Sequence, residues 1–297
     1  MATQPCFGAV EAGGTKFVCA AGRGPLGSEA SFREVIPTTT PEATLGSVVA
    51  FFERVVAATG PLAGIGIAAF GPIDIDPRSA TWGALLATPK AGWSGVSLFE
   101  PLRRFGCRLA IDTDVNAAAL AEARFGAGQG ADPVVYVTVG TGIGGGVVVG
   151  GRSLRGLLHP EMGHIRVRRD RRDQDFPGVC PFHGDCLEGL ASGPAIQARW
   201  QGKLSALPPD HPGTDIIGGY LGQLAATVAL VLSAPRIIFG GGVASGRLLE
   251  HTRAAAAREL AGYLPIDARV GGFERLIVAP ALGEHAGITG ALLLAMN

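Results

Sequence analysis

Four side chains of the kinds that bind zinc lie close together in the sequence. They fall between positions 164 and 186 and are His164, Cys180, His183 and Cys186. Four sulfur and nitrogen ligands close a tetrahedral zinc site and leave no position for water. The pattern therefore predicts a structural Zn²⁺ that holds the loop at 166–179 in place. The alternatives are a chance cluster of free thiols and solvated imidazoles, or a site at which His159 competes as a ligand.

A carboxylate suited to proton transfer stands where a predicted strand meets a predicted helix. Asp114 lies in the run Asp112-Thr-Asp-Val-Asn116, after an expected strand at 107–111 and before a strongly helical run at 117–124. Asp114 or Asn116 is expected to cap this helix. The positive helix end favours the ionised carboxylate, so Asp114 can accept a hydroxyl proton late in phosphoryl transfer. Alternatively, Asp114 is only a cap.

Three glycine-rich turns are suited to binding phosphate, because their backbone N–H groups can face phosphate oxygens. Two of them join pairs of short apolar runs, at 11–16 and 140–146, and the third follows a strand at 236–239. Glu11 is placed to hold magnesium through water. Each turn alone also fits an ordinary hairpin or a tight strand–helix connection. The expected nucleotide contacts are Glu11, Gly13, Gly14, Thr15, Lys16, Gly140, Thr141, Gly142, Gly144, Gly240, Gly241 and Gly242.

Polar residues near the predicted zinc loop are candidates for binding a sugar. Zinc ligation through His164 and Cys186 would fix Glu161 and Glu188, which would offer two acceptors to vicinal hydroxyls. In the loop at 88–93, Lys90 and Trp93 are expected to cover one face of the sugar. The alternatives are two surface glutamates, and an ordinary loop that is anchored by a buried Trp93.

The elements that position these residues alternate between strands and helices. A helix is expected at 43–58 before a buried strand at 64–70, another at 220–232 before the strand at 236–239, and a last one from about Ser245. The class is therefore mixed α/β. The two glycine hairpins resemble each other, which suggests two α/β lobes: residues 1–113, completed by a C-terminal helix at 284–297, and residues 114–283 with the zinc loop.

Composition narrows the classes of function. The 25 basic and 25 acidic residues cancel, so no net positive field attracts nucleic acid or anionic membrane. The N-terminal residues lack the charge and apolarity of a targeting signal, and no stretch is expected to reach the roughly 18 apolar residues of a membrane span. Five cysteines fit a reducing compartment, with Cys6, Cys19 and Cys107 in the core. A cytoplasmic enzyme of small-molecule metabolism is expected.

Taken together, five motifs resemble the ROK family (repressors, open reading frames, kinases) in the family's order. They are residues 11–16, 112–120, 139–144, 161–164 and 186–193, so the resemblance covers nearly the whole chain. It implies a two-lobed actin-like ATPase (ribonuclease H-like) fold with a central nucleotide and sugar cleft, Mg²⁺ with ATP, and usually a homodimer. It also implies Asp114 as catalytic base, hexose contacts at Asn116, Glu161, His164 and Glu188, and His164 as a zinc ligand too.

The choice of sugar depends on departures from the family's glucokinases. Those enzymes usually carry Asp where this chain has Glu11, and a Cys-x-Cys-Gly loop where it has Cys180-x-x-His183-x-x-Cys186. These features and the run at 81–93 are similar to bacterial ROK fructokinases, which implies phosphorylation of the 6-hydroxyl of D-fructose. The alternatives are a mannose or glucose kinase and a non-catalytic sugar-binding regulator. The first hairpin begins too close to Met1 to leave room for a DNA-binding helix-turn-helix.

Overall fold

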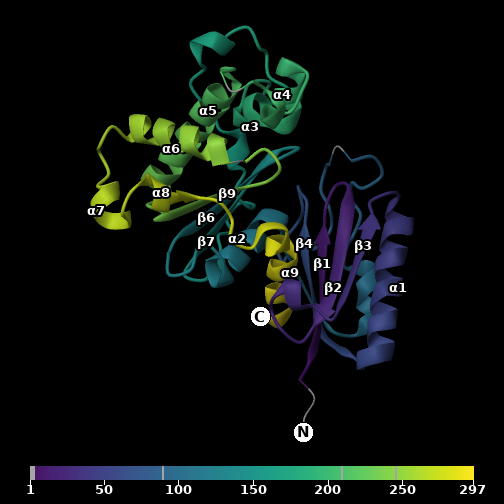
Figure 1. Ribbon diagram of the computed structural model, residues 1–297. Helices are drawn as coiled ribbons and strands as arrows, with labels where there is room; N and C mark the ends of the chain where they lie inside the picture. The colour runs from purple at the N-terminus through teal and green to yellow at the C-terminus, as the bar shows by residue number, and fades with distance from the viewer. Residues whose placement is uncertain (1–3, 89, 209, 245) are drawn as a thin grey trace. The chain divides into compact units, whose positions relative to one another are not determined.

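The computed structural model describes residues 4–88, 90–208, 210–244 and 246–297, which divide into two compact units (Figure 1). Unit 1 comprises Met1–Ala121, Arg155–His159 and Glu284–Asn297, and unit 2 comprises Glu122–Leu154 and Pro160–Gly283. The chain therefore passes from one unit to the other four times. The start of the last predicted helix, Ser245, and Pro89 of the 88–93 loop lie outside the described residues.

Unit 1 is built on a five-stranded mixed sheet in the order β3-β2-β1-β4-β5. Strands β1 and β2 form the first glycine hairpin, and β1 pairs in parallel with β4, which pairs in parallel with β5. The strands are β1 (Cys6–Ala12), β2 (Lys16–Gly22), β3 (Phe32–Pro37), β4 (Leu62–Ala69) and β5 (Arg108–Thr113). The helices of this unit are α1 (Pro41–Thr59), α9 (Ala286–Met296) and the first part of α2 (Asp114–Phe125).

The two faces of this sheet bury different helices, because successive strand residues point to opposite sides. Val10 and Ile65 belong to the cluster that α1 covers with Val48, Phe52 and other residues. On the opposite face, the small side chains of β1, β2 and β4 pack under α9; they include Ala9, Ala20 and Ala68. Thr40 caps the start of α1 through its side chain, and Gly60, with φ of 85°, ends it.

Helix α9, the yellow helix beside β1 and β4 in Figure 1, packs on these two strands with its backbone close to the sheet. A Cβ atom on Gly66 would overlap the carbonyl oxygen of Ala291, and one on Gly64 would lie 2.7 Å from that of Ala295. Real Cβ atoms do not approach oxygen this closely. Glycine at these two positions of β4 is therefore what lets the helix backbone rest on the strand.

Unit 2 repeats the strand plan of unit 1 with its own sheet, in the order β10-β9-β6-β7-β8. Strands β6 and β7 form the second glycine hairpin, and β6 pairs in parallel with β9, which pairs in parallel with β10. The predicted similarity of the two hairpin-led halves is thus confirmed at the level of strand order and direction. The strands are β6 (Val134–Val139), β7 (Ile143–Val149), β8 (Arg152–Ser153), β9 (Arg236–Gly240) and β10 (Ile277–Val278).

Helices and short 3₁₀ turns complete the two units. The remaining helices, all in unit 2, are α3 (Leu187–Ala191), α4 (Gly193–Trp200), α5 (Gly213–Leu232), α6 (Gly246–Leu260), α7 (Ile266–Val270) and α8 (Phe273–Leu276). The 3₁₀ turns are Gly27–Glu29, Glu100–Phe105, Met162–His164, Arg171–Asp173, Leu204–Ala206 and Gly283–His285.

Helix α5 corrects one expectation from the sequence. By length and composition it is apolar enough to cross a membrane, whereas no such segment was expected. In the structure Ile217, Leu221 and Leu224 are buried in the core of unit 2, and α5 packs along α6. The apolarity of α5 is therefore accounted for by its place as the central core helix of unit 2.

Candidate active site

The turn between β5 and α2 is held by side chains of its own sequence. Oδ1 of the fully buried Asp112 accepts hydrogen bonds from Nδ2 of Asn116, at 2.7 Å, and from the Thr113 amide, at 2.8 Å. Thr113 Oγ1 accepts the Asn116 amide at 3.1 Å and so caps the helix. The prediction that Asp114 or Asn116 is the cap was wrong, because the helix begins one residue after Thr113. Asp114, as the first helical residue, stands at the positive end of α2.

Asn116 was expected to contact a sugar, and the structure encloses it. Its side chain is fully buried, and its Oδ1 has no hydrogen-bond partner among the described residues, while Nδ2 is held by Asp112. The amide is thus oriented from one side. A sugar contact through the buried Oδ1 stays a prediction.

Glu11 lies near Asp114 in a poorly solvated position. Burial, and then the nearby Asp114 charge, raise the pKa of Glu11 to about 7. The carboxylate packs against the start of α9, where a Cβ on Gly287 would lie 2.5 Å from Cδ of Glu11. Two neighbouring carboxylates, of which Glu11 has a raised pKa, form a site that favours a cation, since a divalent ion would relieve their repulsion. The donor set therefore fits magnesium.

Replacing Glu11 should make stability less sensitive to pH. The folded protein binds the proton of the Glu11 carboxyl more tightly than the unfolded chain does. The stability that comes from this protonation is therefore present at low pH and is lost as pH rises from about 4.5 to about 7. In Glu11→Gln the loss is absent, so the free energy of unfolding at about pH 8 should rise by up to about 3 kcal/mol. Urea unfolding in EDTA at about pH 8 and about pH 4.5 measures this, with the exposed Glu42→Gln as control. An equal change at both pH values would contradict it.

The first glycine turn presents exposed groups beside this carboxylate pair. The Gly13 amide donates to the Lys16 carbonyl at 3.0 Å, which closes the β1–β2 hairpin. Gly14, Thr15 and Lys16 are exposed, and Thr38, which follows β3, donates through its hydroxyl to the Gly13 carbonyl at 2.8 Å. The turn is therefore fixed at its base and open at its tip.

The second and third glycine turns lie next to each other in unit 2. The amide of Val243, just after Gly240-Gly-Gly242, donates to the carbonyl of Val139, which ends β6. Gly241, with φ of 90°, faces the Val139 backbone so closely that a Cβ atom would overlap it. The two predicted nucleotide-binding segments thus come together at the carboxyl ends of two parallel neighbouring strands, β6 and β9.

Glu188 joins the predicted sugar-binding residues to the second glycine turn. Its Oε2 accepts the Ile143 amide at 2.8 Å and would lie 2.6 Å from a Cβ on Gly142. Glu188 is therefore a half-buried residue at the start of α3, held by the hairpin, and not the solvated surface glutamate of the alternative interpretation. No local sequence signal indicates this contact, because its partners are 45 residues apart.

The two histidines and two cysteines predicted as metal ligands converge on one point of unit 2. One ligand atom from each of His164, Cys180, His183 and Cys186 lies within 4.8 Å of all the others. Nδ1 of His164 is 3.7 Å from Sγ of Cys180 and 3.5 Å from Sγ of Cys186, and Nδ1 of His183 is 3.7 Å from Sγ of Cys180. Ordinary Zn–S and Zn–N bonds at tetrahedral angles place S and N about 3.6 Å apart. The cluster therefore has the dimensions of a zinc site.

His159, the competing ligand of the alternative, lies elsewhere. It is buried in unit 1, where its ring packs against Gly71, and it does not belong to the cluster.

The other predicted sugar contacts differ in exposure. Trp93 is buried, and its indole N–H donates to the Thr39 carbonyl at 3.0 Å. This is the alternative interpretation, in which a buried Trp93 anchors an ordinary loop. Lys90 is half-buried in the same loop, and Glu161 is exposed just before the His164 turn.

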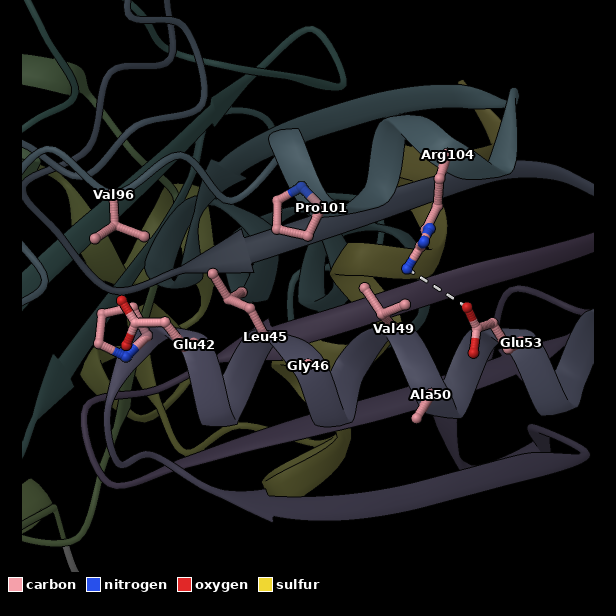
Figure 2. Close-up of a pocket in the computed structure, with 10 residues that line it drawn as sticks. Glu42, Leu45, Gly46, Val49, Ala50, Glu53, Val96, Pro101 and Arg104 are labelled. Carbon is pink, nitrogen blue, oxygen red and sulfur yellow. Dashed lines mark ion pairs between the residues drawn. The ribbon is translucent and has the colours of Figure 1, made fainter.

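A groove of about 590 Å³ lies between α1 and the segment that includes Val96, Pro101 and Arg104. Figure 2 shows Leu45 and Val49 of α1 opposite Pro101, with Glu53 paired to Arg104 at one end. None of its described lining residues belongs to a predicted motif. The groove therefore adds nothing to the candidate active site.

The model of the ROK family matches residues 7–297 of this chain. The chain belongs to the ROK family. Among curated relatives, the fructokinase of Zymomonas mobilis is 43% identical, covering 98% of this chain and 96% of its own, and that of Pediococcus pentosaceus is 39% identical, covering 97% of each. Among solved structures, a ROK hexokinase from Thermus thermophilus superposes with a TM-score of 0.78 at 27% identity, covering 98% of each chain.

Membership of the ROK family confirms the fold expected from the motifs. The mixed α/β architecture with two sheets of the same strand order is that of the two-lobed actin-like ATPase fold. The motifs described above therefore belong to a sugar kinase, an enzyme that transfers a phosphoryl group to a hydroxyl of a sugar.

Proposed function

We propose that this protein is an ATP-dependent fructokinase that phosphorylates the 6-hydroxyl of D-fructose. The observation that carries the proposal is the identity of 38–43% to several bacterial fructokinases, which extends over almost the whole chain in most of them. The glycine turns, Asp114 and the Cys/His loop all lie within the aligned length. The two compact units are proposed as the two lobes of the kinase, and a homodimer is proposed as its assembly.

Asp114 is proposed as the base. It stands at the N-terminus of α2, where the helix favours its ionised form, so it can accept a hydrogen bond from the acceptor hydroxyl and then take its proton. In a loose phosphoryl-transfer transition state the proton moves late, so orientation of the hydroxyl comes first. Lys16 and the amides of the three glycine turns are proposed to hold the phosphates. Magnesium, when bound beside Glu11 through water, would neutralise charge on the ATP phosphates.

A structural zinc ion is proposed for the cluster of His164, Cys180, His183 and Cys186. Four protein ligands leave no open position, so the ion would fix the loop and not activate water. Cys186 and Glu188 are two residues apart at the start of α3, and His164 follows Glu161 in the same 3₁₀ segment. Ligation would thereby stiffen both segments that carry the proposed sugar contacts Glu161, His164 and Glu188.

A substrate panel tests the proposal. ADP release coupled to NADH oxidation is measured with fructose, mannose and glucose, and we expect the highest kcat/KM for fructose. The 27% identical relative is a ROK hexokinase, so turnover of several hexoses is the nearest alternative. Equal or higher kcat/KM for glucose or mannose would reject fructose as the main substrate. Absence of ADP release with every sugar, together with sugar binding, would indicate a non-catalytic regulator.

A further inference from the structure

A short loop carries an arginine to the turn that precedes Asp114. The loop Arg155–His159 belongs to unit 1, although the residues on either side of it, 154 and 160, belong to unit 2. Nη2 of Arg155 lies 2.9 Å from Oδ2 of Asp112, at a separation of 43 residues in the chain. The Asp112 side chain is fully buried, whereas that of Arg155 is 42% exposed. A buried carboxylate is thus paired with a cation that reaches it from a distant segment.

The two oxygens of Asp112 have separate partners. Oδ1 accepts from Thr113 and Asn116 and so shapes the start of α2, and Oδ2 accepts from Arg155. Asp114 lies between Thr113 and Asn116, so its backbone follows the orientation of the Asp112 carboxylate. A change at Arg155 is therefore transmitted to Asp114 through one side chain.

The charge of Asp112 also matters at this position. A buried carboxylate without a counter-ion is strongly unfavourable. Removing the cation of a buried ion pair therefore destabilises a protein by more than an exposed ion pair stabilises it. Two further carboxylates, Asp114 and Glu11, stand nearby and already raise each other's energy when both are ionised. Among the described residues Arg155 is the cation that forms an ion pair with Asp112. Without it, Asp112 would either turn toward solvent or hold a buried charge without its counter-ion beside the other two carboxylates.

We propose that Arg155 is a positioning residue for phosphoryl transfer, which holds the 112–116 turn in its productive form by neutralising Asp112. The proposal rests on the proposed kinase function and adds a residue that the motifs do not contain. The same ion pair anchors the chain six residues before Glu161, a proposed sugar contact. Arg155 acts through Asp112 and is not proposed to contact the sugar or ATP.

The test is a double-mutant cycle on Arg155 and Asp112. We expect Arg155→Met to lower kcat with fructose roughly 10- to 100-fold, as for a misplaced catalytic group, with the KM for ATP changed less than about twofold. Arg155→Lys keeps the charge and should stay within about fivefold of the native kcat. Once Asp112→Asn has removed the buried charge, adding Arg155→Met should change kcat less than about threefold.

Several outcomes would overturn the proposal. One is that kcat per folded molecule is unchanged in Arg155→Met, even if its melting temperature is lower. Another is that Arg155→Met lowers kcat equally in the native and Asp112→Asn backgrounds. Arg54→Met, which breaks an exposed ion pair with Glu34 in the same unit, is the matched control. If Arg155→Met does not fold, the comparison of Asp112→Asn with the double variant decides. Failure of the kinase function itself would show separately, as no ADP release from the native protein.

Discussion

Asp114→Asn should lower kcat for fructose by roughly 10²- to 10⁴-fold, the range that general bases contribute. The substitution keeps the size of the side chain and can still accept the Val115 amide, which now donates to Oδ1 of Asp114 at 2.8 Å. The fold should therefore survive, while the group that accepts the hydroxyl proton is lost. Single-turnover measurements with ATP and fructose separate this loss from product release.

Binding measurements complete this first prediction. Calorimetric titration of Asp114→Asn with fructose should give a Kd within about threefold of the native protein, because an amide still hydrogen-bonds a hydroxyl. The exposed Asp267→Asn in α7 serves as the control and should retain full turnover. Turnover of Asp114→Asn within tenfold of the native rate would show that another group accepts the proton.

Loss of the proposed zinc ion should have the second large effect. Cys186 is fully buried in the Cys/His cluster, and Cys186→Ser leaves three ligands for an ion that needs four. Structural zinc sites contribute on the order of 10 kcal/mol to the folding of small zinc domains, so the loop at 166–179 should become labile. Zinc content should fall from one ion per chain to less than about 0.2, and the KM for fructose should rise more than the KM for ATP.

The control for this variant lies outside the cluster. Cys107→Ser removes a half-buried thiol just before β5 and should leave the zinc content and both KM values unchanged. Native protein purified without chelators and found free of metal would reject the zinc assignment. Retention of zinc by Cys186→Ser would remove Cys186 from the ligand set.

The sequence predicts the parts of this molecule that depend on short segments. Short spacings, from a few residues to about 20, predict the glycine hairpins, the α/β alternation and the Cys/His cluster. Over such spacings the chain has little freedom to move the residues of one motif apart. The cap of α2 was misassigned to Asp114 or Asn116, because Thr113 competes for the same role one position earlier. Neighbouring capping residues cannot be ranked until the end of β5 is known.

Contacts between distant segments were beyond prediction. Glu122 shows why: its buried carboxylate accepts the amides of Ala281 and Leu282, about 160 residues away, and that of Ala127. The sequence around a glutamate on a helix does not indicate that its side chain has such distant partners. The pairing of Arg155 with Asp112 is of the same kind, since both are common residues whose meeting depends on how the chain re-enters unit 1.

The place of α9 has a consequence for how the chain is made. Its residues, 286–296, are translated after all of unit 2, yet they cover a sheet whose strand β4 ends at Ala69. Domains usually fold in the order of synthesis, but unit 1 lacks its covering helix until all of unit 2 has emerged. On the ribosome, the surface around Gly64 and Gly66 therefore stays open while unit 2 acquires its core. The first unit to be started is the last to be finished, and a chain that stops short of α9 leaves that surface exposed.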